Sequence, residues 1–175
     1  MTRAEANRHQ YKKLSALNWL FCVLSAAAVV ALIFTLWFTG IKIADNGMSP
    51  ALYQGDVILF DKLSKHISHP KRGEAYAFST EGTSVGRIAA LPGDNVAIKE
   101  GKVYIEGCLL REINTSASTW ELPEFTVPAS TFLILPDNRT GSMPDKEALL
   151  IPFDDLIGRA SVRVSPIGMA AVFVS

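Results

Sequence analysis

The sequence predicts a mainly β protein in which a single N-terminal transmembrane helix precedes a β-barrel or β-sandwich domain. An apolar run without charge extends from Ala16 to Phe38, and from Ile41 onward short apolar segments alternate with turn residues, without sustained helical periodicity. The chain has 175 residues, 49% of them apolar, which suffices for one domain and this segment. A formal net charge of zero argues against nucleic acid as a partner.

The run from Ala16 to Phe38 is predicted to be a retained membrane anchor. Its only polar residues are Asn18, Ser25 and Thr35, and at about 1.5 Å per residue it is long enough to cross a hydrocarbon core of roughly 30 Å. A cleaved signal peptide is the alternative. Its apolar region would be about 7–15 residues long and would be followed by a small-x-small cleavage site, which we do not find here.

Charged residues before the run predict its orientation. The basic residues Arg3, Arg8, Lys12 and Lys13 outweigh Glu5, and positive flanks tend to stay in the cytoplasm. We therefore expect a single-pass protein of the cell membrane, with a basic cytoplasmic tail at residues 1–15, the helix at 16–38 and an extracytoplasmic domain at 41–175.

Short strand signals predict the architecture of the outer domain. A hairpin is expected between Asn95 and Glu106, with its turn at Lys99–Lys102. Further strands are expected at residues 57–60, 75–78, 84–90, 131–135, 160–164 and 169–174. Such a succession of short strands favours a barrel or a sandwich over a layout of alternating strands and helices.

The segment from Lys62 to Arg72 is polar and basic. We interpret it as a loop near the membrane surface that could contact anionic lipid headgroups, with a solvated loop as the alternative. His66 and His69 lie three residues apart, but no cluster of Cys, Asp or Glu with ligand spacing completes a metal site. We therefore expect neither a metal nor another cofactor.

Two segments carry the main functional prediction. They are Asn46–Leu52 (NGMSPAL) and Val85–Asp94 (VGRIAALPGD). Both resemble segments of the type I signal peptidases, which are membrane serine proteases. In that family a Ser-Met-x-Pro motif supplies the nucleophile, and a Lys-Arg motif that continues to Gly-Leu-Pro-Gly-Asp supplies the general base. The resemblance places Gly47 at the position of the nucleophile and Gly86 at the position of the base.

The two glycines remove the reacting groups that the resemblance implies. A serine protease of this kind needs a hydroxyl and a lysine whose pKa is lowered by burial far below about 10.4. Glycine supplies neither. Ser49 is a weak substitute for the nucleophile, because on an extended segment its oxygen would be displaced by roughly 6–7 Å from position 47. For each glycine alone, a backbone requirement such as positive φ or close strand approach is the simpler interpretation.

A third segment, Leu135–Ser142 (LPDNRTGS), resembles the Gly-Asp-Asn-Arg-x-x-Ser motif of the same family, and Ile151–Ala160 resembles its closing strand. Asp145 matches the aspartate that follows in the family, after one inserted residue. The resemblance implies that Ser142 would orient the missing lysine and that Asp145 forms an ion pair with Arg87. The residues assigned to this structural motif are Arg87, Asp137, Asn138, Arg139, Ser142 and Asp145.

The resemblance also implies a binding slot. Signal peptidases hold an extended substrate between the nucleophile segment and the lysine strand, and the main-chain hydrogen bonds and alternating pockets of such binding do not need the dyad. We expect the loss of two side chains to widen the slot. Its predicted residues are Ile43, Ala44, Asp45, Met48, Leu52, Ser84 and Val85.

The leading hypothesis is a membrane-anchored, catalytically inactive member of this family that binds signal peptides or other extended segments of exported proteins. Its nearest functional analogy is with the signal-peptidase-like proteins of Gram-positive pilus loci, which suggests pilin segments as partners and pilus assembly as the process. There are two alternatives. One is an active type I signal peptidase with substitute catalytic residues, and the other is a structural membrane subunit whose slot is vestigial.

Overall fold

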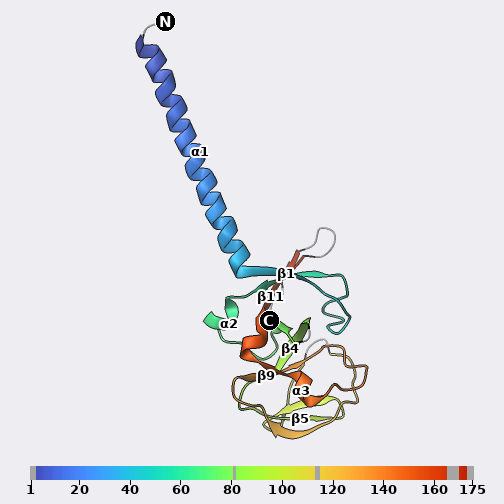
Figure 1. Ribbon diagram of the computed structural model, residues 1–175. Coiled ribbons are helices and arrows are strands. Elements are labelled where there is room, and N and C mark those ends of the chain that lie inside the picture. Colours follow the sequence, from blue (N-terminus) through green and yellow to red (C-terminus); the bar gives the residue numbers. More distant parts are fainter. Residues whose placement is uncertain (1–2, 81, 113–114, 165–169, 173–175) are drawn as a thin grey trace. The chain divides into compact units, whose positions relative to one another are not determined.

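The computed structural model describes residues 3–80, 82–112, 115–164 and 170–172, with side chains from residue 17 to 164 (Figure 1). The chain divides into two units, the first ending at Trp37 and the second beginning at Phe38. Helix α1 (Arg3–Trp37) forms the first unit. Its portion Leu17–Trp37 has 21 residues and a mean hydropathy of 2.5, so it is long and apolar enough to cross a membrane.

The second unit contains an eight-stranded sheet with the strand order β1-β2-β11-β3-β4-β9-β10, and β12 pairs with β11 outside this path. Among the described residues, all of its strand pairs are antiparallel. The strands are β1 (Phe38–Lys42), β2 (Val57–Asp61), β3 (Ala75–Ser79), β4 (Thr83–Ala90), β9 (Thr131–Leu135), β10 (Leu150–Pro152), β11 (Leu156–Val164) and β12 (Ala170–Val172).

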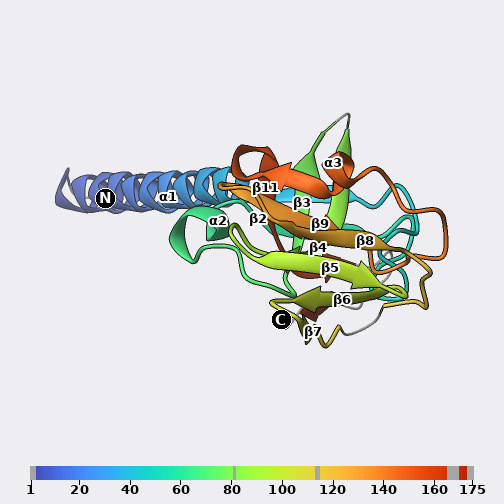
Figure 2. The same cartoon turned by 90° about the horizontal axis from the view of Figure 1, so that it is seen from below.

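A second sheet of four strands has the order β7-β6-β5-β8, which Figure 2 shows as neighbouring arrows. Its strands are β5 (Asn95–Lys99), β6 (Lys102–Ile105), β7 (Cys108–Leu109) and β8 (Leu122–Thr126). Short helical turns complete the unit, namely α2 (Ser64–Ile67), α3 (Lys146–Leu149) and the 3-10 turn η1 (Phe153–Asp155). The predicted fold class, mainly β after one N-terminal helix, is confirmed.

The large sheet is covered by apolar residues on both faces. Ala75 and Ala77 of β3 belong to a buried cluster with Ile43, Met48 and Leu52. Tyr76, between the two alanines, belongs to a different cluster that includes Ile88 and Ile134. A third cluster joins the ends of β4 and β9 to the small sheet; it includes Ala90, Leu133, Val96, Val103 and Trp120. This packing fixes β4, which carries Gly86, between β3 and β9.

Candidate functional site

The three motif segments meet at the end of β9. Asn138 follows this strand, and its backbone N–H donates to the carbonyl of Gly47 over 2.9 Å. Its side-chain amide donates to the carbonyl of Asn46 over 3.3 Å. These two hydrogen bonds fix the Gly47 turn against the segment that follows β9, so the nucleophile position is held by the third motif.

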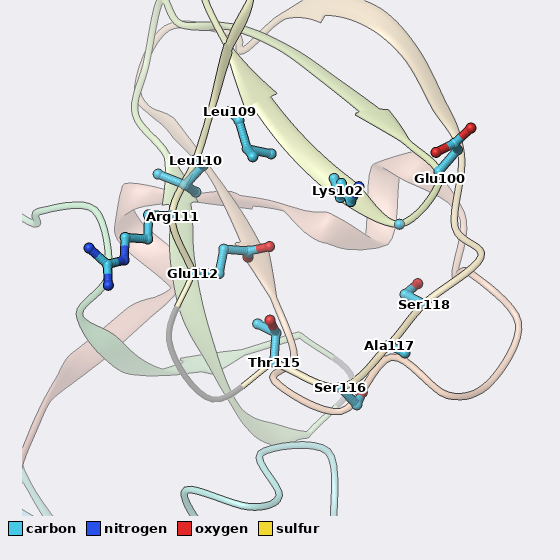
Figure 3. Close-up of a pocket in the computed structure, with 11 residues that line it drawn as sticks. Glu100, Lys102, Leu109, Leu110, Arg111, Glu112, Thr115, Ser116, Ala117 and Ser118 are labelled. Atoms are coloured by element: carbon cyan, nitrogen blue, oxygen red, sulfur yellow. The ribbon is translucent and has the colours of Figure 1, made fainter.

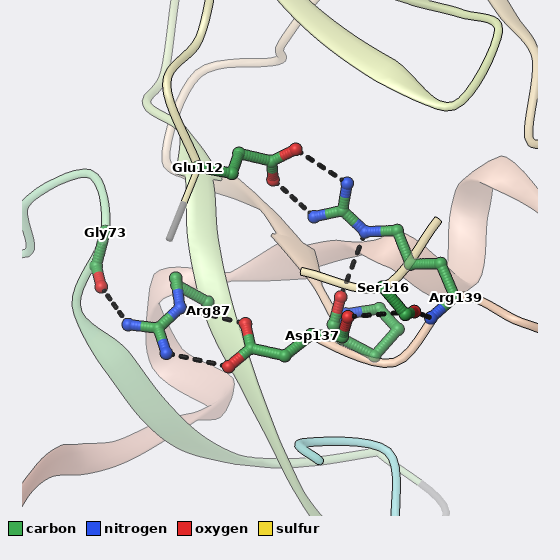
Figure 4. A network of polar contacts seen from close by, with 7 residues as sticks. Gly73, Arg87, Glu112, Ser116, Asp137 and Arg139 are labelled. Carbon is green, nitrogen blue, oxygen red and sulfur yellow. Dashed lines mark hydrogen bonds and ion pairs between the residues drawn. The ribbon is translucent and has the colours of Figure 1, made fainter. Parts of the chain in front are cut away.

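Strand β4, which carries Gly86, is held by Asp137, the residue before Asn138 (Figure 4). Arg87 donates through Nε and Nη2 to the two carboxylate oxygens of Asp137 over 2.9 and 2.8 Å, and through Nη1 to the carbonyl of Gly73. Asp137 is completely buried. The hydrogen bonds with the Asp137 carboxylate raise the pKa of Arg87 above its ordinary value, although burial of the guanidinium group acts in the opposite direction. A bidentate pair of this kind fixes both the position and the orientation of the guanidinium group.

The expected ion pair between Arg87 and Asp145 is wrong. All three nitrogens of the Arg87 guanidinium group donate to Asp137 or Gly73. Asp145 is exposed and precedes helix α3, where its carbonyl accepts the N–H of Ala148. Ser142 is exposed in the preceding loop. Matching the motifs of the family gives the order of Arg87, Ser142 and Asp145 along the chain, but it does not give the distances between them.

A second arginine, Arg139, completes the polar network. Its partner Glu112 is a residue that the sequence analysis missed. Arg139, 3% exposed, pairs through both terminal nitrogens with the carboxylate of Glu112, and its backbone N–H donates to the hydroxyl of Ser116 over 2.7 Å (Figure 4). Glu112 belongs to no motif segment. An unmatched buried cation is costly, so the need of Arg139 for a partner was the available signal.

Gly47 lies in an open environment. Its φ lies outside the left-handed region, so its backbone does not require glycine. A Cβ at this position would lie 3.0 Å from a carboxylate oxygen of Asp45, an exposed side chain that can rotate away, and 3.9 Å from Cβ of Pro136. The backbone N–H of Gly47 donates to the same Asp45 oxygen over 2.7 Å. A small side chain would fit here after a shift of Asp45.

Gly86 lies in a filled environment. It is buried, and its φ also lies outside the left-handed region. A Cβ would lie 2.5 Å from Cγ2 of Ile134, 3.3 Å from the carbonyl oxygen of Leu135 and 3.5 Å from Cε1 of Phe78. The first distance is a steric overlap, because carbon atoms prefer separations of about 3.5–4.0 Å. Close strand approach is therefore a sufficient local reason for glycine at this position, whereas positive φ is not.

Six of the seven predicted slot residues line one narrow pocket between the end of β1, the Gly47 turn and the start of β4. They are Ile43, Ala44, Asp45, Met48, Ser84 and Val85, joined by Ile41, Lys42 and Thr83. Leu52 lies beneath the slot and is completely buried. The pocket has a volume of about 10 Å³, enough for roughly one water molecule. The expectation that two lost side chains widen the slot is wrong at Gly86, where Cγ2 of Ile134 occupies the position of a Cβ.

One side of β4 is open beside this slot. Strand β3 pairs with β4 from Thr83 to Arg87, but β9 pairs with β4 only from Arg87 onward. Among the residues that the structure describes, positions 83–86 therefore have a strand partner on one side only. An unpaired strand edge offers backbone donors and acceptors to an added extended segment.

Among the described residues of the slot and the Gly47 turn, no serine and lysine form a substitute catalytic dyad. Ser49 is half-buried and its N–H donates to the carbonyl of Asn46 within the turn. Lys42 is the lysine that lines the pocket, and it is exposed. A lysine acts as a general base in such a site when it is desolvated. An exposed lysine at the rim does not meet this condition.

A wider cavity of about 440 Å³ lies at the small sheet, away from both glycines (Figure 3). Its wall is formed by the β5–β6 turn at Glu100–Lys102, by Leu109–Glu112 and by Thr115–Ser118. Glu112 in this wall is the partner of Arg139. Ser116, which accepts the backbone N–H of Arg139, also lines it. The cavity therefore shares two residues with the polar network but none with the slot.

Comparison with known proteins agrees with this geometry. The family described as signal peptidase, peptidase S26, matches residues 16–165. The chain belongs to this family. The signal peptidase match includes the apolar helix, the Gly47 turn, β4 and the segment after β9. Members of the signal peptidase I family are anchored in a membrane, consistent with the single apolar helix of this chain.

Individual relatives include proteins named signal peptidase I and a protein named inactive. A probable signal peptidase I-2 from Synechocystis is 32% identical over 71% of this chain, and the match spans 62% of that relative's length. A protein named inactive signal peptidase IA from Staphylococcus aureus is 24% identical over 85% of this chain and 91% of its own length. A solved signal peptidase I from Enterococcus faecalis has a TM-score of 0.44 and 21% identity, covering 51% of this chain and 95% of that chain.

Proposed function

We propose that this protein is a pseudopeptidase, a membrane-anchored signal peptidase homologue that binds extended segments of exported proteins without cleaving them. One observation carries the proposal. Hydrogen bonds fix the Gly47 turn and strand β4 in place, but a Cβ at position 86 would overlap Cγ2 of Ile134. This supports a site without a general base, because position 86 carries no side chain and has no room for a Cβ in the present packing.

The binding mode follows from the open side of β4. An extended peptide can add to residues 83–86 through main-chain hydrogen bonds, with alternate side chains directed at the slot. Because the slot has room for roughly one water molecule, small side chains such as alanine are the ones it admits with least rearrangement. Signal peptides are the segments implied by the family, and small residues near their ends suit this pocket.

The cellular setting is part of the same proposal. We place residues 1–15 in the cytoplasm, the helix at 16–38 in the cell membrane and the domain at 41–175 outside, from the basic residues before the helix. The existence of a relative named inactive supports a role for family members without peptidase activity. Pilin segments and pilus assembly in a Gram-positive cell extend the proposal by analogy alone.

A crosslinking experiment tests this function. The full-length protein in detergent is incubated with a preprotein that carries a small-x-small junction and a photoreactive group beside it. Ser84→Arg places a bulky side chain in the slot, and Ser161→Arg is the matched control on β11, which does not line the slot. We expect crosslinking without cleavage, reduced about tenfold by Ser84→Arg, corresponding to about 1.4 kcal/mol of binding free energy, and unchanged in the control.

Other outcomes decide between the alternatives. Cleavage at the junction that is abolished by Ser49→Ala would establish an active peptidase with a substitute nucleophile and refute the proposal. Absence of any crosslink would refute peptide binding. A stable complex with a secretion component that survives Ser84→Arg, without preprotein binding, would establish a structural subunit instead.

A further inference from the structure

We propose that Asp45 sets a charge preference of the slot. The protein then favours extended segments in which a basic residue lies one or two positions from the small residue that enters the slot. Because this preference concerns the segments that the slot binds, it rests on the proposed function. It adds a requirement that the volume of the slot alone does not impose. Asp45 and the residues around it all belong to the second unit.

The charge of Asp45 is not compensated within the protein. Among the described residues that line the slot, Asp45 is the acidic one. It is exposed, and in the described part of the chain it forms no ion pair. The buried carboxylates of Asp56, Glu74 and Asp137 differ, since each of them pairs with an arginine. The negative charge of Asp45 is therefore available to a bound segment.

The turn that carries Asp45 is held on both sides of this residue. Gln54 donates through its side-chain amide to the carbonyl of Ala44 over 2.9 Å, and through its backbone N–H to the side-chain oxygen of Asn46 over 3.0 Å. The carbonyl of Asn46 also accepts the side-chain amide of Asn138. Because the residues before and after Asp45 are anchored, its side chain starts from a defined place in the wall of the slot.

The Asp45 carboxylate keeps acceptor capacity for a ligand. One of its oxygens accepts the backbone N–H of Gly47 over 2.7 Å. An ionised carboxylate has about four lone-pair sites, so this hydrogen bond leaves room for a further donor. The ammonium group of a lysine or the guanidinium group of an arginine can donate and also compensate the charge. An acidic residue at the same place would be repelled.

Lys42, the other charged residue that lines the slot, has a different direction. Ile41 and Ile43, on either side of it, pack into the same buried cluster. Since successive side chains of a strand point to opposite faces, Lys42 lies on the face opposite to that cluster. Its ammonium group is therefore directed away from the apolar floor of the slot, whereas the Asp45 carboxylate is directed toward Gly47.

The spacing of an extended chain decides which residues of the segment can meet Asp45. A segment that adds to the open side of residues 83–86 places one small side chain in the slot. At about 3.3 Å per residue, the next two residues lie within about 7 Å of that side chain. The flexible side chain of lysine can span such a distance. Because Asp45 lines the same slot, a basic residue at either position can reach it.

Fluorescence anisotropy with matched peptides tests this preference in the full-length protein in detergent. Each peptide has a central alanine and carries Lys, Gln or Glu on both sides of it, adjacent to the alanine in one set and two positions away in the other. In at least one set, we expect the Lys peptide to bind about threefold more tightly than the Gln peptide and the Glu peptide about threefold more weakly, as for exposed ion pairs. Added salt should reduce both ratios, because exposed charges are screened.

Variants of Asp45 assign the preference to its charge. Asp45→Asn should remove the ranking of the peptides, and Asp45→Lys should reverse it. Asp45→Glu keeps the charge and should retain the ranking, which separates the charge from a merely structural role of the residue. Asp154→Asn is the matched control, because it removes an exposed carboxylate that does not line the slot, and it should leave the ranking as it is.

Failure of the charge preference is distinguishable from failure of peptide binding. Equal binding of all peptides in both sets would overturn the role of Asp45 and leave peptide binding established. A ranking that survives Asp45→Asn but disappears with Lys42→Gln would assign the preference to Lys42 and would also overturn the proposal. Binding of none of the peptides would refute the proposed function, and the charge preference with it.

Discussion

The surroundings of Gly47 and of Gly86 differ, although the motif correspondence assigns both glycines to positions of one catalytic dyad. At Gly47 a side chain would meet the mobile end of an exposed aspartate, whereas at Gly86 it would overlap a methyl group of the buried Ile134. Both positions lie against consecutive residues at the end of β9, because Pro136 is next to the first and Leu135 is next to the second. The nucleophile position is open and the base position is closed.

This difference predicts that side chains at the two positions would not be equally well accommodated. A protein interior is close-packed, so a vacated volume that has been filled resists the return of the original side chain. Serine could return at Gly47 with a rotation of Asp45. Lysine could return at Gly86 only with a change at Ile134, and that requirement is the basis of the largest predicted effect.

Restoring the dyad should require a third substitution. Gly47→Ser with Gly86→Lys places the reacting groups in a site where Ile134 displaces the lysine, and a displacement of about 1 Å can cost on the order of 10²-fold in rate. Ile134→Leu removes the overlapping Cγ2 at constant volume. We therefore expect the triple variant to cleave a preprotein about 10²-fold faster than the double variant. Equal rates for both would show that Ile134 does not close the site.

Asp137, which holds β4 through Arg87, and Asn138, which holds the Gly47 turn, should contribute differently to the free energy of unfolding. Asp137→Ala leaves Arg87 without its carboxylate partner, and removal of one member of a buried pair costs about 3–5 kcal/mol. Asn138→Ala removes the amide hydrogen bond to the carbonyl of Asn46 and the side-chain acceptor of Ser116 and Thr140. Because most of these contacts are exposed, we expect a loss of about 1–2 kcal/mol. Denaturant unfolding of the second unit measures both, with Asp154→Ala on the surface as the control. A smaller loss for Asp137→Ala would contradict the ranking.

The sequence was sufficient to predict elements whose signal is local. The strands at 57–61, 75–79, 83–90, 95–99, 102–105 and 131–135 are short apolar runs bounded by turn residues. β8 was missed because Pro123 and Glu124 interrupt its pattern and only Leu122 is buried in its first half. Helix α2 was missed because its start is set by Asp61, which lies outside the helix.

The candidate site was predicted in its residues but not in its contacts. Motif order identified Gly47, Gly86 and the segment after β9, and the structure brings these together. The partner of Arg87 was assigned to Asp145 instead of Asp137, since two aspartates after the same strand are indistinguishable without distances. The filling of position 86 depends on the pairing of Ile88 with Ile134, a register between strands that are far apart in sequence.

The substitution Gly86→Ala tests directly whether position 86 has room for a side chain. Alanine ordinarily stabilises a strand relative to glycine, but here its Cβ would overlap Cγ2 of Ile134 at 2.5 Å. Overpacking of this kind costs about 1–3 kcal/mol in the free energy of unfolding. Combination with Ile134→Leu should recover most of that loss, and the coupling between the two substitutions is read from a double-mutant cycle. Additive effects would mean that the two side chains do not compete for space.

The open position should give the smallest effect. Gly47→Ala brings a Cβ to 3.0 Å from the Asp45 carboxylate, which must rotate and weaken its hydrogen bond with the backbone N–H. Because this bond is exposed and alanine also lowers the entropy of the unfolded chain, we expect a loss below about 1 kcal/mol. In an Asp45→Ala background the same substitution should cost nothing further. A loss as large as that of Gly86→Ala, persisting without Asp45, would show that the nucleophile position is closed too.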